Sequence, residues 1–89
     1  MPGGEVTSYV TQWCGFSQKL MKDLEAGKDM LASKDVKVNL IDCESEDGKL
    51  LCQAAQVKGF PHNVNSCGQA MPGYVPIEKF VEFATSCPQ

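Results

Sequence analysis

Two segments rich in β-branched residues, separated by a helical segment, restrict the fold of this chain most strongly. Residues 5–10 (EVTSYV) alternate as a strand does, and residues 36–42 (VKVNLID) end in consecutive apolar residues, which predicts a central strand covered on both faces. Between them a helix is predicted from Gly15 to about Ser33, which Gly27 can end or bend. Its apolar stripe consists of Phe16, Leu20, Leu24 and Leu31. A strand, a helix and a strand in this order predict a parallel pair joined by a right-handed crossover.

The second half of the chain adds two helices and a short hairpin. Residues 49–57 predict a helix that stops just before Gly59. Residues 62–65 and 69–71 predict antiparallel strands around a Ser-Cys-Gly turn. A last helix begins near Pro76, and its apolar face is formed by Ile77, Phe80, Val81 and Ala84. The order β-α-β-α-β-β-α predicts an α/β fold with a mixed four-stranded sheet flanked by helices.

Length and charge narrow the class of function. The 89 residues form one small domain, which we place at 5–87, with a flexible start at 1–4. The net charge is −3 and the basic residues are scattered, which argues against nucleic acid or an anionic membrane as a partner. No apolar run reaches the roughly 18 residues that span a bilayer, and the first residues lack the features of a signal peptide.

The chain contains five cysteines, an odd number that leaves at least one free or paired outside the chain. They are Cys14, Cys43, Cys52, Cys67 and Cys87. Their spacing gives no CxxC pair and His62 is the one histidine, so we expect no metal site. Cys67 is expected in an exposed turn, and Cys87 is expected to pair outside the domain or to fray.

Cys14 lies where the first strand ends and the first helix begins, at the edge of the sheet where such folds bind their ligands. The free N–H groups and the dipole of a helix N-terminus favour a thiolate, which predicts a lowered pKa and a nucleophile. Trp13 would shield one side of the sulfur, and Gly15 would let a substrate backbone approach. The competing interpretation is an inert cysteine beside a core tryptophan.

Ser17 stands one helical turn after Cys14, so its hydroxyl can donate a hydrogen bond to the thiolate but cannot resolve a mixed disulfide. Two other interpretations of Ser17 are a solvated first-turn residue and a replaced cysteine. A cis bond before Pro61 would let the Phe60 backbone pair with a substrate strand beside Cys14, whereas a trans proline would start an edge strand. His62 either tunes Cys14 or is a half-exposed strand residue.

Four motifs together resemble the thioredoxin superfamily, over nearly the whole chain. They are Trp-Cys-Gly-Phe-Ser at 13–17, Val-Asn-Leu-Ile-Asp at 38–42, Gly-Phe-Pro at 59–61 and Pro-Gly-Tyr at 72–74. Residues 40–61 are similar to the thioredoxin-like domain fused to vitamin K epoxide reductase homologues. That similarity implies a Cys43–Cys52 disulfide, an oxidising compartment and a membrane partner of the epoxide reductase type.

The sequence Cys-Gly-Phe-Ser at 14–17 also resembles the monothiol glutaredoxins. That resemblance implies glutathione binding and a [2Fe–2S] cluster shared between two protomers. Ser8 stands where thioredoxins bury an aspartate that assists their second cysteine, so this chain lacks that acid as well as that thiol.

We therefore interpret the chain as a monomeric thiol–disulfide oxidoreductase that forms mixed disulfides with protein or small-thiol partners through Cys14, assisted by Ser17. It requires no cofactor, although glutathione is a possible one. The substrate-binding residues would be Trp13, Gly15, Phe16, Phe60 and Pro61. Two alternatives are a glutathione-dependent [2Fe–2S] cluster carrier and a binding module in which Cys14 does no chemistry.

Overall fold

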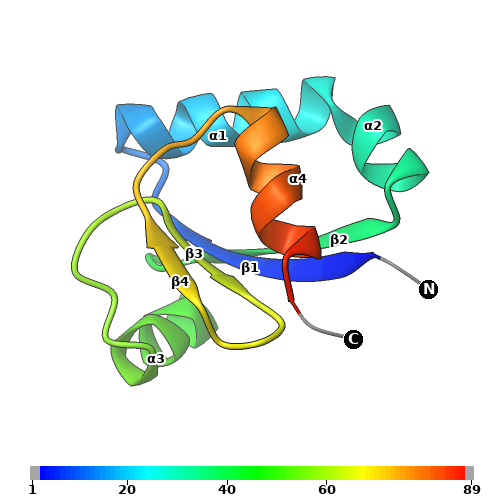
Figure 1. Cartoon of the computed structure of the whole chain (residues 1–89). Helices are drawn as coiled ribbons and strands as arrows, with labels where there is room; N and C mark the ends of the chain where they lie inside the picture. Colours follow the sequence, from blue (N-terminus) through cyan, green and yellow to red (C-terminus); the bar gives the residue numbers. More distant parts are fainter. Residues whose placement is uncertain (1–2, 88–89) are drawn as a thin grey trace.

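The computed structural model describes residues 3–87, which form four strands and four helices (Figure 1). The elements are β1 (Gly4–Val10), α1 (Gly15–Ala26), α2 (Lys28–Ser33), β2 (Val36–Asp42), α3 (Glu46–Ala54), β3 (His62–Asn65), β4 (Ala70–Pro72) and α4 (Ile77–Thr85). No helix among the described residues is long and apolar enough to cross a membrane.

The four strands form one mixed sheet in the order β2-β1-β3-β4. β1 is parallel to β2, whereas β3 is antiparallel to both of its neighbours, β1 and β4. Helices α1, α2 and α4 cover one face of the sheet and α3 lies against the other (Figure 1). This arrangement confirms the predicted α/β fold with a mixed four-stranded sheet.

The hydrophobic core lies between the sheet and the three-helix layer. It consists of Val6, Leu20, Leu24, Leu31, Val36, Phe80 and Ala84. Three of the four residues in the predicted helical stripe are therefore core residues. The fourth, Phe16, is 63% exposed because it lies in the first turn of α1, at the end of the sheet where Cys14 is found.

Several element boundaries differ from those predicted. The first helix is divided at Gly27, whose N–H still donates to the Asp23 carbonyl. Helix α3 begins three residues earlier than expected, because the Ser45 hydroxyl caps it by accepting from the Gly48 N–H. Met1 and Pro2 of the predicted flexible start lie outside the described residues, and Gly4 already belongs to β1.

The prediction that residues 36–42 form a central strand is wrong, because β2 is at the edge of the sheet. The two interior strands are β1, which pairs with β2 and β3, and β3, which pairs with β1 and β4. As a consequence Leu40 on β2 remains 48% exposed. The consecutive apolar residues of this segment thus predicted a fully buried strand, whereas the structure buries β2 only in part.

Two disulfides close loops on opposite sides of the core. Cys43 just after β2 is joined to Cys52 in α3, and Cys67 in the β3–β4 turn is joined to Cys87 after α4. The expectation that Cys87 pairs outside the domain or frays is therefore wrong. Loops of this length each contribute about 3 kcal/mol in the chain-entropy account, a large share of the stability of so small a domain.

The contact between α3 and the end of β2 generates a testable prediction at Gly48. A Cβ atom there would lie 1.7 Å from the Asp42 carbonyl oxygen, whereas one at Gly59 would meet nothing within 4 Å. We expect Gly48→Ala to lower the free energy of unfolding by about 1 to 3 kcal/mol through overpacking, and Gly59→Ala to leave it unchanged. Urea denaturation of the two variants measures the difference, and equal stabilities would contradict this packing.

Candidate functional site

Cys14 is the N-cap residue of α1 and the one free cysteine among residues 3–87. It follows the carboxyl end of β1, and the end of β2 lies alongside, since the Cys43 N–H donates to the Val10 carbonyl at 2.9 Å. The side chain of Cys14 is partly buried. Because the parallel pairing of β1 and β2 brings their carboxyl ends together, the position of Cys14 is that predicted from the sequence.

The sulfur of Cys14 faces the segment around Pro61, which is remote in sequence. Its thiol donates to the Phe60 carbonyl oxygen at 3.7 Å, and the Phe60–Pro61 peptide bond is cis. Pro61 is fully buried, and its own carbonyl accepts from the Gly73 N–H at 2.7 Å. Gly73 has a φ of 90°, a conformation that suits glycine. This hydrogen bond holds Pro61, the residue after the carbonyl that faces Cys14, from the β4 side.

The helix N-terminus controls the charge of the thiol. The Ser17 N–H has the largest effect and lowers the pKa of Cys14, partial burial raises it, and the Phe16 N–H and Ser17 hydroxyl lower it further. The net result is a pKa below the ordinary value. In the protonated state Sγ makes no cap hydrogen bond and points to the Phe60 carbonyl instead. A thiolate loses that acceptor contact and is favoured by the N–H groups.

Ser17 is fully buried, so its interpretation as a solvated residue is wrong. Its hydroxyl oxygen accepts a hydrogen bond from the Thr11 N–H at 3.3 Å. The proton of the hydroxyl remains available to Cys14, in agreement with the lowering effect of this group on the pKa of the thiol. Thr11 is also buried, and its Oγ1 has no hydrogen-bond partner in the described part of the chain.

A layer of neutral polar side chains lies inside the domain on the same face of the sheet as the core. Ser8 is fully buried and its hydroxyl donates to Asn63 Oδ1 at 2.7 Å. The Asn63 amide donates in turn to the Met71 and Gly73 carbonyls. Sequence reasoning missed Thr11 and Asn63, although a polar residue at an inward-facing position of a strand is the signal that identifies Asn63.

Exposed aromatic side chains surround Cys14. Trp13 is 67% exposed and packs edge-on against the Phe60 ring, with centroids 5.9 Å apart and an interplanar angle of 80°. Phe16 presents a second exposed ring one residue beyond Gly15. A Cβ atom at Gly15 would meet nothing within 4 Å, so the surface in front of the helix N-terminus is open. Trp13 and Phe16 thus expose apolar area beside Cys14, a feature that often marks an interaction surface.

His62, which the sequence offered as a residue that could tune Cys14, lies apart from this surface. His62 is half-buried on β3 and its ring packs against Tyr9 at 6.0 Å. It pairs across the strands with Tyr9, on the sheet face opposite to Ser8 and Asn63. Within residues 3–87 no three His, Cys, Asp or Glu side chains come together in a way that could hold a metal ion.

Comparison with known proteins supports the fold from two directions. Over 57 residues the chain is 39% identical to protein disulfide-isomerase 1 of Dictyostelium discoideum, which is 63% of this chain but 16% of that protein. Chloroplastic thioredoxin z superimposes with a TM-score of 0.75 at 22% identity, covering 91% of this chain and 74% of the other. Thioredoxin-2 of the malaria parasite gives a TM-score of 0.76 at 12% identity, covering 91% and 80%.

No family model matches the chain. The disulfide-isomerase relative is several times longer, since the chain spans about a sixth of its length. The structural neighbours cover almost all of the described residues, with the same arrangement of sheet and helices. The chain has a thioredoxin-like fold.

The lowered pKa of Cys14 predicts how alkylation of this thiol depends on pH. Because the thiolate is the reacting form, the rate should persist below the pH at which an ordinary cysteine, of pKa about 8.5, loses reactivity. It should fall as the pH drops through the lowered pKa. Iodoacetamide labelling read by peptide mass spectrometry gives the midpoint for the folded protein and for the protein in guanidinium.

Ser17→Ala separates the two contributions of this residue. It removes the hydroxyl but keeps the N–H, which has the larger effect, so the midpoint should rise slightly and remain below the guanidinium value. A midpoint for the folded wild-type chain at or above the guanidinium value would contradict the site.

Proposed function

We propose that this domain is a thiol–disulfide oxidoreductase that works with one nucleophile, Cys14. The observation that carries the proposal is the free thiol at the N-cap of α1, aimed at the Phe60 carbonyl 3.7 Å away. The lowered pKa favours the thiolate form of Cys14, and the open apolar surface leaves room for a partner. Similarity to part of a protein disulfide-isomerase supports the same chemistry.

The proposed reaction begins with attack of the Cys14 thiolate on one sulfur of a partner disulfide. A new bond forms between Cys14 and that sulfur, the partner disulfide breaks, and its second sulfur leaves as a thiolate. The backbone around Phe60 would pair with the partner segment next to the attacked sulfur. Trp13 and Phe16 would contact its apolar side chains, and this positioning would favour attack at the correct distance.

The mixed disulfide cannot be resolved from within this chain. Ser17 offers an oxygen, and the four other cysteines are already joined in two disulfides. A thiol from outside must therefore complete the cycle. This favours disulfide isomerisation, mixed-disulfide capture or removal of glutathione from a protein over net reduction.

Two disulfides in so small a domain support an oxidising compartment as its location. The similarity of residues 40–61 to the domain fused to vitamin K epoxide reductase homologues makes a membrane-bound redox partner of that type a candidate. The cluster-carrier alternative needs partners from outside the chain. Cys14 would be the one ligand that each protomer supplies, and glutathione would have to supply the others.

The lifetime of the mixed disulfide tests the proposal. Wild-type protein mixed with a disulfide-linked model peptide should accumulate a covalent adduct at Cys14, and glutathione should release it. Ser17→Cys supplies a resolving thiol on the same helical face, so its adduct should disappear without added thiol. Cys14→Ala should form no adduct. If Cys14→Ala binds the peptide as tightly as wild type and wild type forms no adduct either, the domain is a binding module.

The aromatic surface generates a separate prediction. Trp13→Ala should slow adduct formation with an apolar-flanked disulfide peptide by about five- to thirtyfold, equivalent to the loss of one or two kcal/mol of contact. Leu50→Ala is the matched control, because Leu50 is equally exposed but lies on α3, across the sheet. Stopped adduct assays give the rates, and equal slowing by both variants would argue against a peptide surface at Trp13.

A further inference from the structure

The Cys67–Cys87 disulfide lies at the end of the sheet opposite to Cys14. The β3–β4 turn that carries Cys67 follows Asn65, which pairs with Val6 near the start of β1, whereas Cys14 follows the end of β1. Cys67 is exposed and Cys87 is partly buried, whereas in the other disulfide Cys43 is partly buried and Cys52 is buried. Cys67 is therefore the most accessible of the four sulfur-bearing residues to an attacking thiol.

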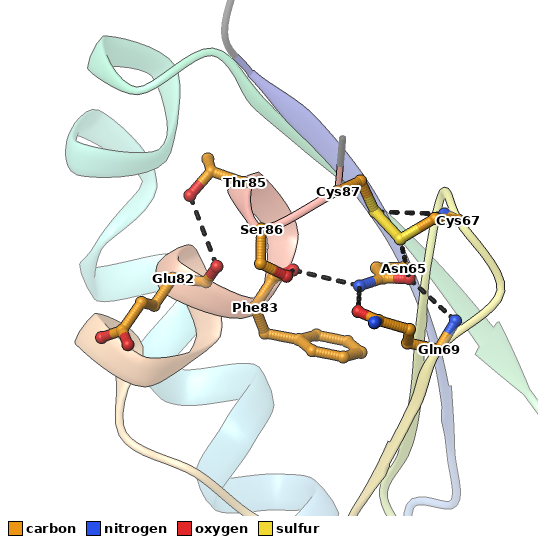
Figure 2. The surroundings of a disulfide bond; sticks show 8 residues. All are labelled: Asn65, Cys67, Gln69, Glu82, Phe83, Thr85, Ser86 and Cys87. Carbon is orange, nitrogen blue, oxygen red and sulfur yellow. Dashed lines mark hydrogen bonds between the residues drawn. A yellow bond between two sulfur atoms is a disulfide. The ribbon is translucent and has the colours of Figure 1, made fainter. Parts of the chain in front are cut away.

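The two sulfur atoms of this disulfide have opposite surroundings (Figure 2). Cys87 Sγ accepts a hydrogen bond from the Cys67 N–H at 3.2 Å. Cys67 Sγ lies 3.2 Å from Asn65 Oδ1, and because a disulfide sulfur carries no hydrogen, this is a contact between oxygen and sulfur. Negative charge is thus favoured on Cys87 and disfavoured on Cys67.

The orientation of the Asn65 amide is fixed by its other partners. Its Nδ2 donates to Gln69 Oε1 at 3.0 Å and to the Phe83 carbonyl at 3.2 Å. Its Oδ1 accepts from the Gln69 N–H at 2.9 Å. A flipped amide would turn Nδ2 toward the Gln69 N–H and leave two acceptors without a donor. Since Asn65 is also buried, its oxygen is held toward Cys67.

We propose that Cys67–Cys87 is a second thiol–disulfide exchange site, at which a thiolate attacks Cys67 and Cys87 is the leaving group. A bond forms between the incoming sulfur and Cys67 Sγ, and the Cys67–Cys87 bond breaks. Its electron pair stays on Cys87 Sγ, where the Cys67 N–H stabilises the new thiolate until it takes a proton from water. A second thiolate then attacks the incoming sulfur of the mixed disulfide, so that the two incoming groups become joined in a disulfide. Cys67 Sγ leaves as a thiolate, and both cysteines are then reduced.

When a small thiol is the incoming group, exchange at Cys67–Cys87 requires neither Cys14 nor the function proposed for it. The incoming thiolate can come from a small thiol of the glutathione type or from Cys14 of a second copy of the chain. The Cys14→Ala chain, treated with glutathione, isolates the first source. Concentrated wild-type protein without glutathione tests the second, which would give a dimer linked between Cys14 and Cys67.

The test is the position of the adduct. Full-length Cys14→Ala protein is treated with glutathione, sampled at early times, alkylated with N-ethylmaleimide and analysed by peptide mass spectrometry. Glutathione should be found on Cys67 and the alkyl group on Cys87, with a preference of about tenfold, the bias expected from one hydrogen bond to the charged leaving sulfur. In guanidinium, where the contacts are lost, the preference should disappear.

Three results would overturn the proposal. They are an equal distribution of glutathione over the two sulfurs in the folded protein, a preference for Cys87, and exchange at Cys43–Cys52 before Cys67–Cys87. A glutathione adduct on Cys67 identifies the small thiol as a competent source, and a Cys14–Cys67 dimer identifies the second copy. If wild-type protein forms no adduct at Cys14 with the model peptide, the glutathione result at Cys67 is unaffected. The two proposals can therefore fail separately.

Discussion

The parallel pairing of β1 with β2 is the constraint on which the rest of this structure depends. A parallel pair needs a crossover, and α1 and α2 supply it while covering one face of the sheet. The same pairing brings the carboxyl ends of both strands to the same end of the sheet. Cys14 follows β1 at this end and Cys43 follows β2, so the free thiol and one disulfide are placed there together.

The environment of Cys14 consists of backbone dipoles and hydrogen bonds rather than of buried charges. Ser8, Thr11, Ser17 and Asn63 form the polar interior near the strands, and none of them ionises in the physiological range. The backbone N–H groups at the start of α1 therefore control the charge of Cys14. Among residues 3–87 the buried polar side chains are all neutral, which agrees with the proposal that Cys14 works without a second thiol.

The five cysteines are divided between three roles. Cys14 is free at the start of α1, the Cys43–Cys52 bond holds α3 to the end of β2, and the Cys67–Cys87 bond holds the hairpin turn to the end of α4. In the Cys67–Cys87 bond Cys67 is exposed and the two sulfur atoms have different neighbours. In the Cys43–Cys52 bond Cys52 is buried. The two disulfides stabilise a domain with a small core, and the two proposed sites of thiol chemistry lie at its opposite ends.

The sequence by itself determined the element order, the mixed sheet and the position of Cys14 at a helix N-terminus, because these follow from local periodicity and from the crossover rule. Tertiary structure decided what depends on contacts between remote segments. It placed β2 at the edge, buried Ser17 against Thr11, and brought Cys67 to Cys87. The direction of the Asn65 amide was also set there, since its partners come from β3, the turn and α4. Spacing along a chain carries no signal for such pairings.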